Sequence, residues 1–567
     1  MTPAELLALG REVRDGYLGN RPAPEALATF SAGCLGAWER LPDADRRAFG
    51  QVYTPPNVVD QILDDVGFDG RRVGRLLDPA CGTGALLARA AGRIAAACRE
   101  PDEGARRILT DLAGIEIRPE IADLARLHLE LLARDLLARD GRTTGGPLPA
   151  PAIVTADALE PGLLAGERFR WIVGNPPYLE AKRAEEADKR RWRSRFAGRV
   201  EGAFDLYVCF LEFALEHISA DGDIGMVIPN KFMVNRYARS LRRRLLAARP
   251  PRTLRDLSHL PIFRNTGVYP IILHLAAPGT GVCTTVGPDG AAAEMDLRAF
   301  EATGAAATFC IPPDPRLGAL MSRLLTGEMP RLAAHLQFRS TVSFHKKGLR
   351  ERYVAPGARE GRRPYLGGKS WMRRKEIAPF AVEWDGYGIR YAAEELAAIG
   401  NPLPPEGLFD QPKIVICQHA RRLMAYWDEN GEYVTKDVYP IALAPRDCPD
   451  PAAHTAAWTA LLNSRILSAL YAVLFRGISI GGGYFHFLPA FLEQVPCPAL
   501  PEDDVAALAR TTASLQRGSP DPAALAEVDA IAGRLYGLSD EESAALAAAF
   551  RNSCDNADPV TGLQRAL

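Results

Sequence analysis

The 567-residue chain contains ten cysteines, but no two of them form a C-x-x-C pair. Cys34, Cys98, Cys209 and Cys417 instead lie in apolar or mixed runs. Zinc-binding cysteines usually come in closely spaced pairs, and secreted disulfide scaffolds are short and cysteine-rich. We therefore expect a reduced, cytoplasmic protein without a structural zinc or other bound metal.

The sequence also lacks a long hydrophobic run. No segment approaches the roughly 18 consecutive apolar residues of a membrane span. The N-terminal sequence MTPAELLALGREVRDGYLG has no apolar core of the signal-peptide type. We expect neither secretion nor a membrane partner.

Neither sign of charge is in excess, because the formal net charge is −1. This argues against a protein whose whole surface is basic and coats nucleic acid. The charge is nevertheless sorted by region. Arg236 to Arg255 contains eight arginines and no acid, Arg339 to Lys375 contains twelve basic residues and two acids, and the tail after Pro501 has eleven acids and five bases. Such runs are often solvated faces, but basic blocks among aromatics also suit a phosphate-tracking surface.

Apolar runs and helical patterns alternate through the first half of the chain. The expected strands lie in VGRLLDP, LAGIEI, PAIVT, FRWIVG, GDIGMVIP and VYPIILHLA. This alternation predicts an α/β fold with a doubly wound, mostly parallel sheet. Ligands of such sheets bind beyond the carboxyl ends of the strands.

We expect four segments along the chain. They are an N-terminal helical segment (1–47), an α/β domain (48–325), a second domain of mixed α+β structure (326–500) and a helical tail (501–567). The Gly-, Ala- and Thr-rich stretch at 277–295 is interpreted as a peripheral hairpin or linker. In the second domain, PKIVICQHARRLMAYWDENGEYVTKDVYPIAL predicts antiparallel strands with a turn at residues 429–431. In the tail, a helix should stop at Gly537 and another should be capped by Ser539.

The first strand leads into DPACGTG. Gly82 and Gly84 would let a ligand approach the backbone at a helix N-terminus, although a G-x-G can also be only a tight turn. The motif is not G-x-G-x-x-G, since Leu87 replaces the third glycine, and this disfavours a dinucleotide site.

Acids follow the next two strands. Glu116 ends the second strand and Asp157 the third. Each alone could be a helix cap or a surface residue, but an acid there can also accept ribose hydroxyls or an adenine amine. Together with the glycines they predict a pocket for an adenosine without phosphates.

The fourth strand runs into GNPPY. Pro176 and Pro177 cannot donate ladder hydrogen bonds, so strand pairing must stop there. A rigid turn is the simplest interpretation of this loop, and only the other strand ends suggest more.

The order YTPP, DPACGTG, IEI, ADAL and NPPY resembles the gamma-class adenine DNA methyltransferases of the TaqI type, a restriction-modification methylase family. The resemblance extends through FDLYVCFLEFAL and GMVIPNKF and resumes in PKIVICQHARRLMAYW, GGGYFHFLPAFLEQVPCP and LYGLSDEES, so that it covers nearly the whole chain after residue 50. It implies a seven-stranded methyltransferase sheet followed by a target-recognition domain.

The resemblance implies S-adenosylmethionine as methyl donor. It assigns the ribose to Glu116, the adenine face to Ile117 and the adenine amine to Asp157, and the methionine end to the loop and the motif near Thr54. The implied cofactor-binding set is Thr54, Asp78, Ala80, Gly82, Gly84, Glu116, Ile117 and Asp157.

The chemistry of an adenine amine gives the GNPPY loop a function. Its lone pair is delocalised into the ring, and the Asn175 side-chain oxygen and the Pro176 carbonyl could each accept one amine hydrogen and turn the lone pair toward the methyl donor. Proline's fixed φ holds that carbonyl, and no strong base is required. The implied catalytic set is Asn175, Pro176, Pro177, Tyr178, which would stack on the base, and Phe263, which could also be a core residue.

Duplex DNA is the implied partner. A paired adenine must be flipped out to reach such a pocket, and the two basic blocks could flank the duplex. The candidate DNA-binding residues are Arg242, Arg243, Lys346, Lys347, Trp371, Arg373 and Arg374. The SIGGGYFHF stretch could also approach DNA, although a packed glycine turn is favoured.

Other functions stay open. Some NPPY enzymes methylate a guanine amine in RNA or a glutamine in protein, and a catalytically silent DNA-recognition subunit is a further alternative. Glu180-Ala181-Lys182 matches a nuclease E-x-K pattern, but without a separate domain around it we expect no nuclease in this chain. A separately encoded endonuclease or defence protein would then be a partner.

Overall fold

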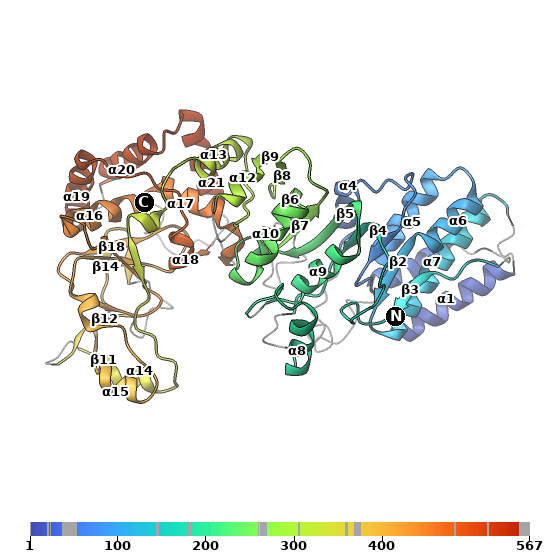
Figure 1. Ribbon diagram of the computed structural model, residues 1–567, viewed down its shortest axis with the longest axis horizontal. Helices are drawn as coiled ribbons and strands as arrows, with labels where there is room; N and C mark the ends of the chain where they lie inside the picture. The colour runs from blue at the N-terminus through green and yellow to red at the C-terminus, as the bar shows by residue number, and fades with distance from the viewer. Residues whose placement is uncertain are drawn as a thin grey trace. The chain divides into compact units, whose positions relative to one another are not determined.

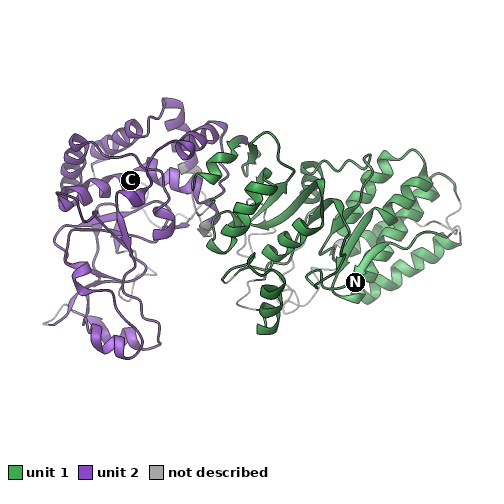
Figure 2. Cartoon of the chain, in the orientation of Figure 1, with its two compact units in different colours: residues 1–290, 294–308 green, residues 291–293, 309–567 purple. Residues whose placement is uncertain are grey.

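The computed structural model divides the chain into two compact units (Figure 1, Figure 2). The first comprises residues 1–290 and 294–308, and the second comprises residues 291–293 and 309–567. The structure describes residues 2–19, 22, 24–36, 54–142, 147–179, 184–202, 204–258, 260, 269–303, 307–357, 361–367, 376–480, 484–518 and 521–554.

One large sheet organises the first unit. Its strand order is β3-β2-β1-β4-β5-β7-β6-β8-β9. The strands are β1 Leu76–Asp78, β2 Leu112–Glu116, β3 Ala152–Thr155, β4 Phe169–Gly174, β5 Ile218–Pro229, β6 Pro251–Asp256, β7 Pro270–Leu275, β8 Val282–Val286 and β9 Ala292–Asp296.

Most neighbours in this sheet are parallel. β1 pairs in parallel with β2 and β4, β2 with β3, β4 with β5, and β6 with β8, whereas β7 runs antiparallel between β5 and β6. The mostly parallel α/β fold predicted from the sequence is confirmed. Within the described residues the sheet has nine strands rather than seven, because the stretch interpreted as a peripheral hairpin or linker forms β8 and β9 and extends the edge beyond β6.

Helices follow the strands in chain order. They are α1 Pro3–Leu18, α2 Pro24–Gly36, α4 Pro56–Asp65, α5 Ala85–Ala97, α6 Pro101–Thr110, α7 Pro119–Arg139, α8 Glu186–Arg195, α9 Tyr207–His217, α10 Arg239–Ala248 and α12 Leu297–Glu301, with the short 3-10 turns η3 Asn230–Met233 and η4 Arg236–Ala238. Helices α4 to α7 share one apolar cluster with alternate strand residues, including Leu76, Trp171 and Val173. Burial of this cluster is the main force that holds the sheet in place. Helix α9 packs on β5.

The N-terminal helices pack on α7 (Figure 1). Leu6, Val13 and Phe30 join Leu124 and Leu131 of α7 in a second apolar cluster. The hydroxyl of Tyr17 also donates to Asp135 of α7 at 2.8 Å. The described part of this segment consists of α1 and α2.

Two arginines of the first basic block lie in the interior. Arg242 is fully buried and donates to the carbonyls of Phe232, Asn235 and Ala307 at 2.6–2.8 Å. Burial lowers the pKa of its guanidinium to about 10. Arg249 likewise donates to three carbonyls of residues 219–222. The prediction that Arg242 contacts DNA is therefore wrong, because its donors are used within the fold.

The second unit contains several small sheets and a helical layer. Its strand orders are β10-β20-β16-β18, β11-β15-β12-β19, β13-β14 and β17-β22-β21. The strands are β10 Gln337–Arg339, β11 Val354–Pro356, β12 Arg363–Leu366, β13 Ile377–Ala378, β14 Ala381–Val382, β15 Tyr387–Ile389, β16 Lys413–Ile416, β17 His419–Ala420, β18 Ala425–Asp428, β19 Val434–Thr435, β20 Ile441–Leu443, β21 Ser479–Ile480 and β22 Tyr484–His486.

The helices of this unit are α13 Pro315–Thr326, α14 Leu349–Tyr353, α15 Ala393–Ala398, α16 Pro451–Leu462, α17 Arg465–Leu474, α18 Pro489–Leu492, α19 Glu502–Arg517, α20 Pro522–Leu535 and α21 Asp540–Cys554, with 3-10 turns η6 Leu332–Ala334, η7 Glu406–Phe409 and η8 Arg476–Ile478. Helix α16 packs against α19 and the β16–β18 sheet, and α17 packs against α20 and α21. The mixed α+β structure followed by helices is confirmed.

A buried ion pair joins two of the predicted antiparallel strands. β16 and β18 run antiparallel, with Lys413 opposite Asp428 and their side chains in direct contact. Asp428 also accepts from the backbone N–H groups of Glu432 and Tyr433. The turn after β18 therefore exists, but it leads to β19, which pairs with β12 instead of returning along β18.

The end of the second unit follows its sequence signals. Gly537 adopts a positive φ of 58° after α20. Ser539 then caps α21, because its hydroxyl accepts from the Glu542 N–H and its own N–H donates to the Glu542 carboxylate. Among the described residues no single helix could span a membrane by length and composition; α16 and α17 reach that threshold only as a pair bent by 67°.

Candidate active site

The carboxyl ends of β1 to β4 meet at one edge of the sheet. Asp78, the last residue of β1, pairs in register with Gly114 of β2, and Glu116, the last residue of β2, pairs with Thr155 of β3. Leu77 pairs with Ile172 of β4. The three strand-end motifs and the GNPPY loop are therefore neighbours in space, as the strand order of the sheet requires.

The loop after β1 is shaped by its glycines. Gly82 and Gly84 have φ values of 54° and 79°, in the left-handed region that side chains disfavour. The Cys81 N–H donates to the Ile115 carbonyl of β2, which holds the loop against the strand ends. A Cβ atom at Gly82 would meet nothing within 4 Å. The loop therefore leaves open space above its backbone at the start of α5.

Two buried carboxyl groups lie at the ends of β1 and β2, beside this loop. Asp78 is 4% exposed and Glu116 is 2% exposed. Burial raises the pKa of Asp78 to about 7. The hydrogen bond that its carboxylate accepts from the Ala80 N–H acts in the opposite direction and lowers the pKa. Burial also raises the pKa of Glu116, although its carboxylate accepts from the Arg118 N–H at 3.0 Å. Buried acids with perturbed pKa values are candidates for a functional site.

The next two predicted residues differ in their surroundings. Ile117 is 49% exposed and is one of the few exposed large apolar side chains among the described residues. Asp157 uses both carboxylate oxygens: one accepts from the Leu159 N–H at 2.9 Å and the other pairs with Arg191 of α8 at 2.8 Å. Sequence reasoning did not anticipate this arginine, which lies 34 residues from its partner.

The β4 strand ends at Gly174, directly beside Asp78. A Cβ atom at Gly174 would lie 2.8 Å from Asp78 Oδ1, closer than a real Cβ contact allows. A side chain at residue 174 would therefore force Asp78 to shift where the first motif and the GNPPY loop approach one another. The strand ends here, as the two prolines after Asn175 predict.

The Asn175 amide is oriented by Thr54. Its Nδ2 donates to the Thr54 hydroxyl at 3.0 Å. The amide oxygen, the acceptor that the sequence analysis requires, therefore points to the opposite side of the amide group. The structure brings Thr54 to the asparagine of the loop, a contact that no local sequence signal could predict because 121 residues separate the two.

Tyr178 is anchored at both ends of its side chain. Its hydroxyl donates to the Val227 carbonyl of β5 at 3.1 Å, and its ring packs against the apolar cluster beneath the sheet. Burial raises its pKa well above the ordinary value, so the hydroxyl stays a donor. Pro176 and Pro177 are buried, and Asn175 is half-buried between them and the strand.

The loop after β1 is supported from behind by the N-terminal helices. The Thr83 hydroxyl donates to the Cys34 carbonyl of α2 at 2.9 Å. His128 of α7, 1% exposed, contacts the Ser31 hydroxyl at 3.0 Å and the Thr83 carbonyl at 3.4 Å. Burial lowers the pKa of His128 to about 4, so the ring is neutral near pH 7. Sequence reasoning missed this support, because a histidine on an apolar helix face gives no local signal of its partners.

The candidate DNA-binding residues are distributed over both units. Arg243 is exposed on α10, and Lys346 and Lys347 are exposed in the second unit, where Lys346 donates to the Ile399 carbonyl at 2.5 Å. Four predicted residues lie outside the described residues: Phe263, Trp371, Arg373 and Arg374.

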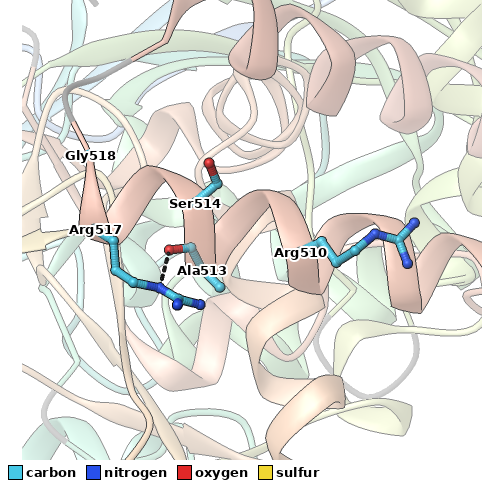
Figure 3. Close-up of a pocket in the computed structure, with 5 residues that line it drawn as sticks. All are labelled: Arg510, Ala513, Ser514, Arg517 and Gly518. Atoms are coloured by element: carbon cyan, nitrogen blue, oxygen red, sulfur yellow. Dashed lines mark hydrogen bonds between the residues drawn. The ribbon is translucent and has the colours of Figure 1, made fainter.

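A surface hollow of about 510 Å³ lies elsewhere, along α19 (Figure 3). Its lining consists of Arg510, Ala513, Ser514, Arg517 and Gly518, and none of these is a predicted site residue. Over the part of the chain that the structure describes, no group of three His, Cys, Asp or Glu side chains could hold a metal ion.

Two known families match the chain. Residues 111–263 match the Eco57I restriction-modification methylase family, and residues 369–497 match the TaqI-like C-terminal specificity domain. The first segment includes β2, β3, β4 and the GNPPY loop. The resemblance to restriction-modification methylases that the motif order predicts is confirmed.

Curated relatives match over part of their length. The chain is 30% identical over 240 residues to the Type II methyltransferase M.BstVI of Geobacillus stearothermophilus, covering 40% of this chain and 42% of that protein. It is 28% identical over 250 residues to M.PaeR7I of Pseudomonas aeruginosa, covering 41% of each. The matched region thus spans about two fifths of the length of these relatives.

Solved structures share the fold. The Type IIL restriction-modification enzyme MmeI in complex with DNA aligns with a TM-score of 0.57 and 14% identity over 92% of this chain and 81% of that one. A nuclease-deletion mutant of the Type ISP enzyme LlaGI with a DNA substrate mimic aligns with a TM-score of 0.50 and 12% identity. The alignment covers 82% of this chain and 47% of that chain. At these identities the likeness concerns the fold alone.

Substitution of Gly174 tests the close approach of the two motifs. Gly174→Ala places a methyl group against Asp78, so we expect the free energy of unfolding to fall by about 1–3 kcal/mol. Gly92→Ala is the matched control, because a Cβ there meets nothing within 4 Å in the middle of α5, and it should be neutral or stabilising. Urea unfolding measures both. Equal stability of the two variants would contradict the crowded geometry.

Proposed function

Because the chain carries a restriction-modification methylase domain followed by a TaqI-like specificity domain, we propose that it is a site-specific DNA methyltransferase. Its target is the exocyclic amine of an adenine in duplex DNA, and its methyl donor is S-adenosylmethionine. The observation that carries the proposal is the Asn175 amide, oriented by Thr54 at the end of β4 beside the glycine loop and the two buried acids.

The residues at the strand ends fit this cofactor. Gly82 leaves room for a ligand above the loop, Asp78 and Glu116 are buried acids beneath it, and Ile117 is an exposed apolar surface suited to an aromatic ring. Asp78 suits the ammonium group of the methionine end, and Glu116 suits the ribose hydroxyls. When bound, S-adenosylmethionine supplies a methyl group on a positively charged sulfur.

The chain's own contribution is to hold the acceptor amine. The Asn175 oxygen and the Pro176 carbonyl each accept one amine hydrogen, which draws the nitrogen toward tetrahedral geometry and frees its lone pair. The Thr54 hydrogen bond fixes the amide before substrate arrives, so little reorganisation remains for the reaction. Tyr178, held by Val227, supplies a flat surface for the base.

A base in this position must leave the duplex. Flipping costs a few kcal/mol, partly offset by stacking on aromatic side chains such as Tyr178 and Phe263. We propose the residues 48–325 as the catalytic domain and 326–500 as the domain that selects the DNA site, with exposed Arg243, Lys346 and Lys347 and the residues Trp371, Arg373 and Arg374 as candidate contacts. The protein would act in the cytoplasm as the modification arm of a restriction-modification or defence system, beside a separately encoded nuclease.

Asn175→Ala tests the reaction. The variant loses one of two acceptors for the amine, so we expect transfer of labelled methyl to duplex DNA to fall at least about a hundredfold. S-adenosylmethionine binding should stay within about twofold of wild type, as the control. Mass spectrometry of digested DNA identifies the product, and a methyl group on cytosine instead of adenine would overturn the adenine assignment. Undiminished transfer would remove Asn175 from the mechanism.

Acidification should weaken cofactor binding. Asp78 has a pKa of about 7, and a cationic ligand favours its ionised form, so the proton must leave on binding. If one proton is released on binding, the dissociation constant for S-adenosylmethionine should rise roughly twentyfold from pH 7.5 to pH 5.5. The pKa of Glu116 is also raised, so this residue acts in the same direction. Calorimetry across this range measures it. Asp78→Asn should bind weakly with a much flatter pH profile, and a wild type insensitive to pH would contradict the assignment.

Arg191 competes for Asp157. Its guanidinium occupies one carboxylate oxygen where the adenine amine would bind. We expect Arg191→Ala to bind S-adenosylmethionine about two- to fivefold more tightly, the modest size reflecting a partly exposed ion pair. Arg193→Ala on the same helix is the control, since Arg193 contacts Glu186 and Gly202 rather than Asp157. Weaker binding by the Arg191 variant would mean that the arginine positions the carboxylate instead.

A further inference from the structure

One small sheet of the second unit has a polar aromatic face over a rigid base. β17, β22 and β21 form this antiparallel sheet, in which His419 lies opposite His486 and Ala420 opposite Phe485. Ala420, Phe485 and Phe487 are buried, and both phenylalanine rings pack on Tyr471. The hydroxyl of Tyr471 also donates to the His486 carbonyl at 2.5 Å. The backbone of the ribbon is thus fixed from below.

The opposite face carries four half-buried side chains, His419, Arg421, Tyr484 and His486. The imidazole rings of His419 and His486 meet edge to face with centroids 4.1 Å apart. The Arg421 guanidinium lies 5.1 Å from the centre of the Tyr484 ring. Alternation along the two strands places these side chains on one side, away from the apolar base. We call these four residues the His-Arg face.

The composition of this face favours contact with base edges. Residues 417–424 and 484–489 contain no Asp or Glu, so the face carries the positive charge of Arg421 and two imidazoles. Arginine binds the O6 and N7 atoms of guanine through its two-pronged guanidinium, and a two-stranded β-ribbon fits the major groove of duplex DNA. Stacking on Tyr484 holds the guanidinium plane in place before DNA arrives, which lowers the entropy cost of the contact.

From these observations we propose that the His-Arg face reads bases of the duplex DNA target, with Arg421 and His486 as specificity-determining residues. This inference rests on the proposed function and goes further, because it assigns the selection of the DNA sequence to named side chains. It lies within residues 369–497, the segment that matches the TaqI-like specificity domain.

The test maps methylated bases in the DNA of a host without adenine methylation of its own, expressing the full chain. Arg421→Ala and His486→Ala should methylate the wild-type sites roughly five- to a hundredfold more slowly in vitro, the range for loss of one base contact. Their maps should also contain new sites that differ from the wild-type sequence at one position. Binding of S-adenosylmethionine should not change.

Arg510→Ala is the matched control, since Arg510 is an exposed arginine of the same unit that lies on α19 (Figure 3). It should leave both rate and map as in wild type. Arg421→Lys keeps the positive charge but removes the two-pronged guanidinium donor, so its methylation map should be relaxed like that of Arg421→Ala. Thermal unfolding shows whether the alanine variant folds poorly. In that case the lysine variant still tests the proposal.

Three results would overturn the proposal. The first is an unchanged map and rate in both face variants. The second is slower methylation of all sites with an unchanged map, because that behaviour marks a phosphate contact rather than base reading. The third is a wild-type protein that methylates no DNA, and in that case it is the proposed function that fails.

Discussion

The approach of Gly174 to Asp78 is the constraint on which the site depends. Parallel pairing of β1 with β4 brings the two strand ends so close that a Cβ atom at residue 174 would lie 2.8 Å from Asp78 Oδ1. The glycine loop and buried acids, which we propose hold the methyl donor, therefore lie beside the asparagine and prolines, which we propose hold the acceptor. A methyl transfer needs this proximity, because positioning supplies much of the rate when no strong base takes part. Backbone pairing of β1 with β4 sets this proximity, and the apolar cluster that includes Leu76, Trp171 and Val173 holds the strands in place.

The strand ends were predictable because their signals are local. An apolar run that stops at Gly, Pro or an acid predicts both a buried strand and the place where its loop begins. The other elements depend on partners far away in the sequence. β6 begins at the second of two prolines and has little apolar periodicity. β8 and β9 join the sheet only because β6 offers an edge for β8. Their assignment as a peripheral hairpin or linker followed from composition, which says nothing about an available edge.

Charge along the sequence proved a poor guide to charge on the surface. The arginines of residues 236–255 look alike in the sequence, but Arg242 and Arg249 hold buried carbonyls, Arg244 pairs with buried Glu212, and Arg243 faces solvent. Only tertiary packing distinguishes them. The same limit applies to the contacts of Asn175 with Thr54 and of Asp157 with Arg191, which join residues more than 30 positions apart. The roles of Phe263, Trp371, Arg373 and Arg374 stay predictions.

The hydrogen bonds of Thr83 to Cys34 and of His128 to Ser31 bear on the N-terminal boundary of the α/β domain in a fusion protein. Motif order alone suggests that the α/β domain starts near residue 48 and could be fused to a different recognition domain from there. Such a chimera would keep every motif but leave the back of the glycine loop, and the apolar face of α7, exposed to water. Protein engineers who recombine specificity domains should carry α1 and α2 along as part of the methylase.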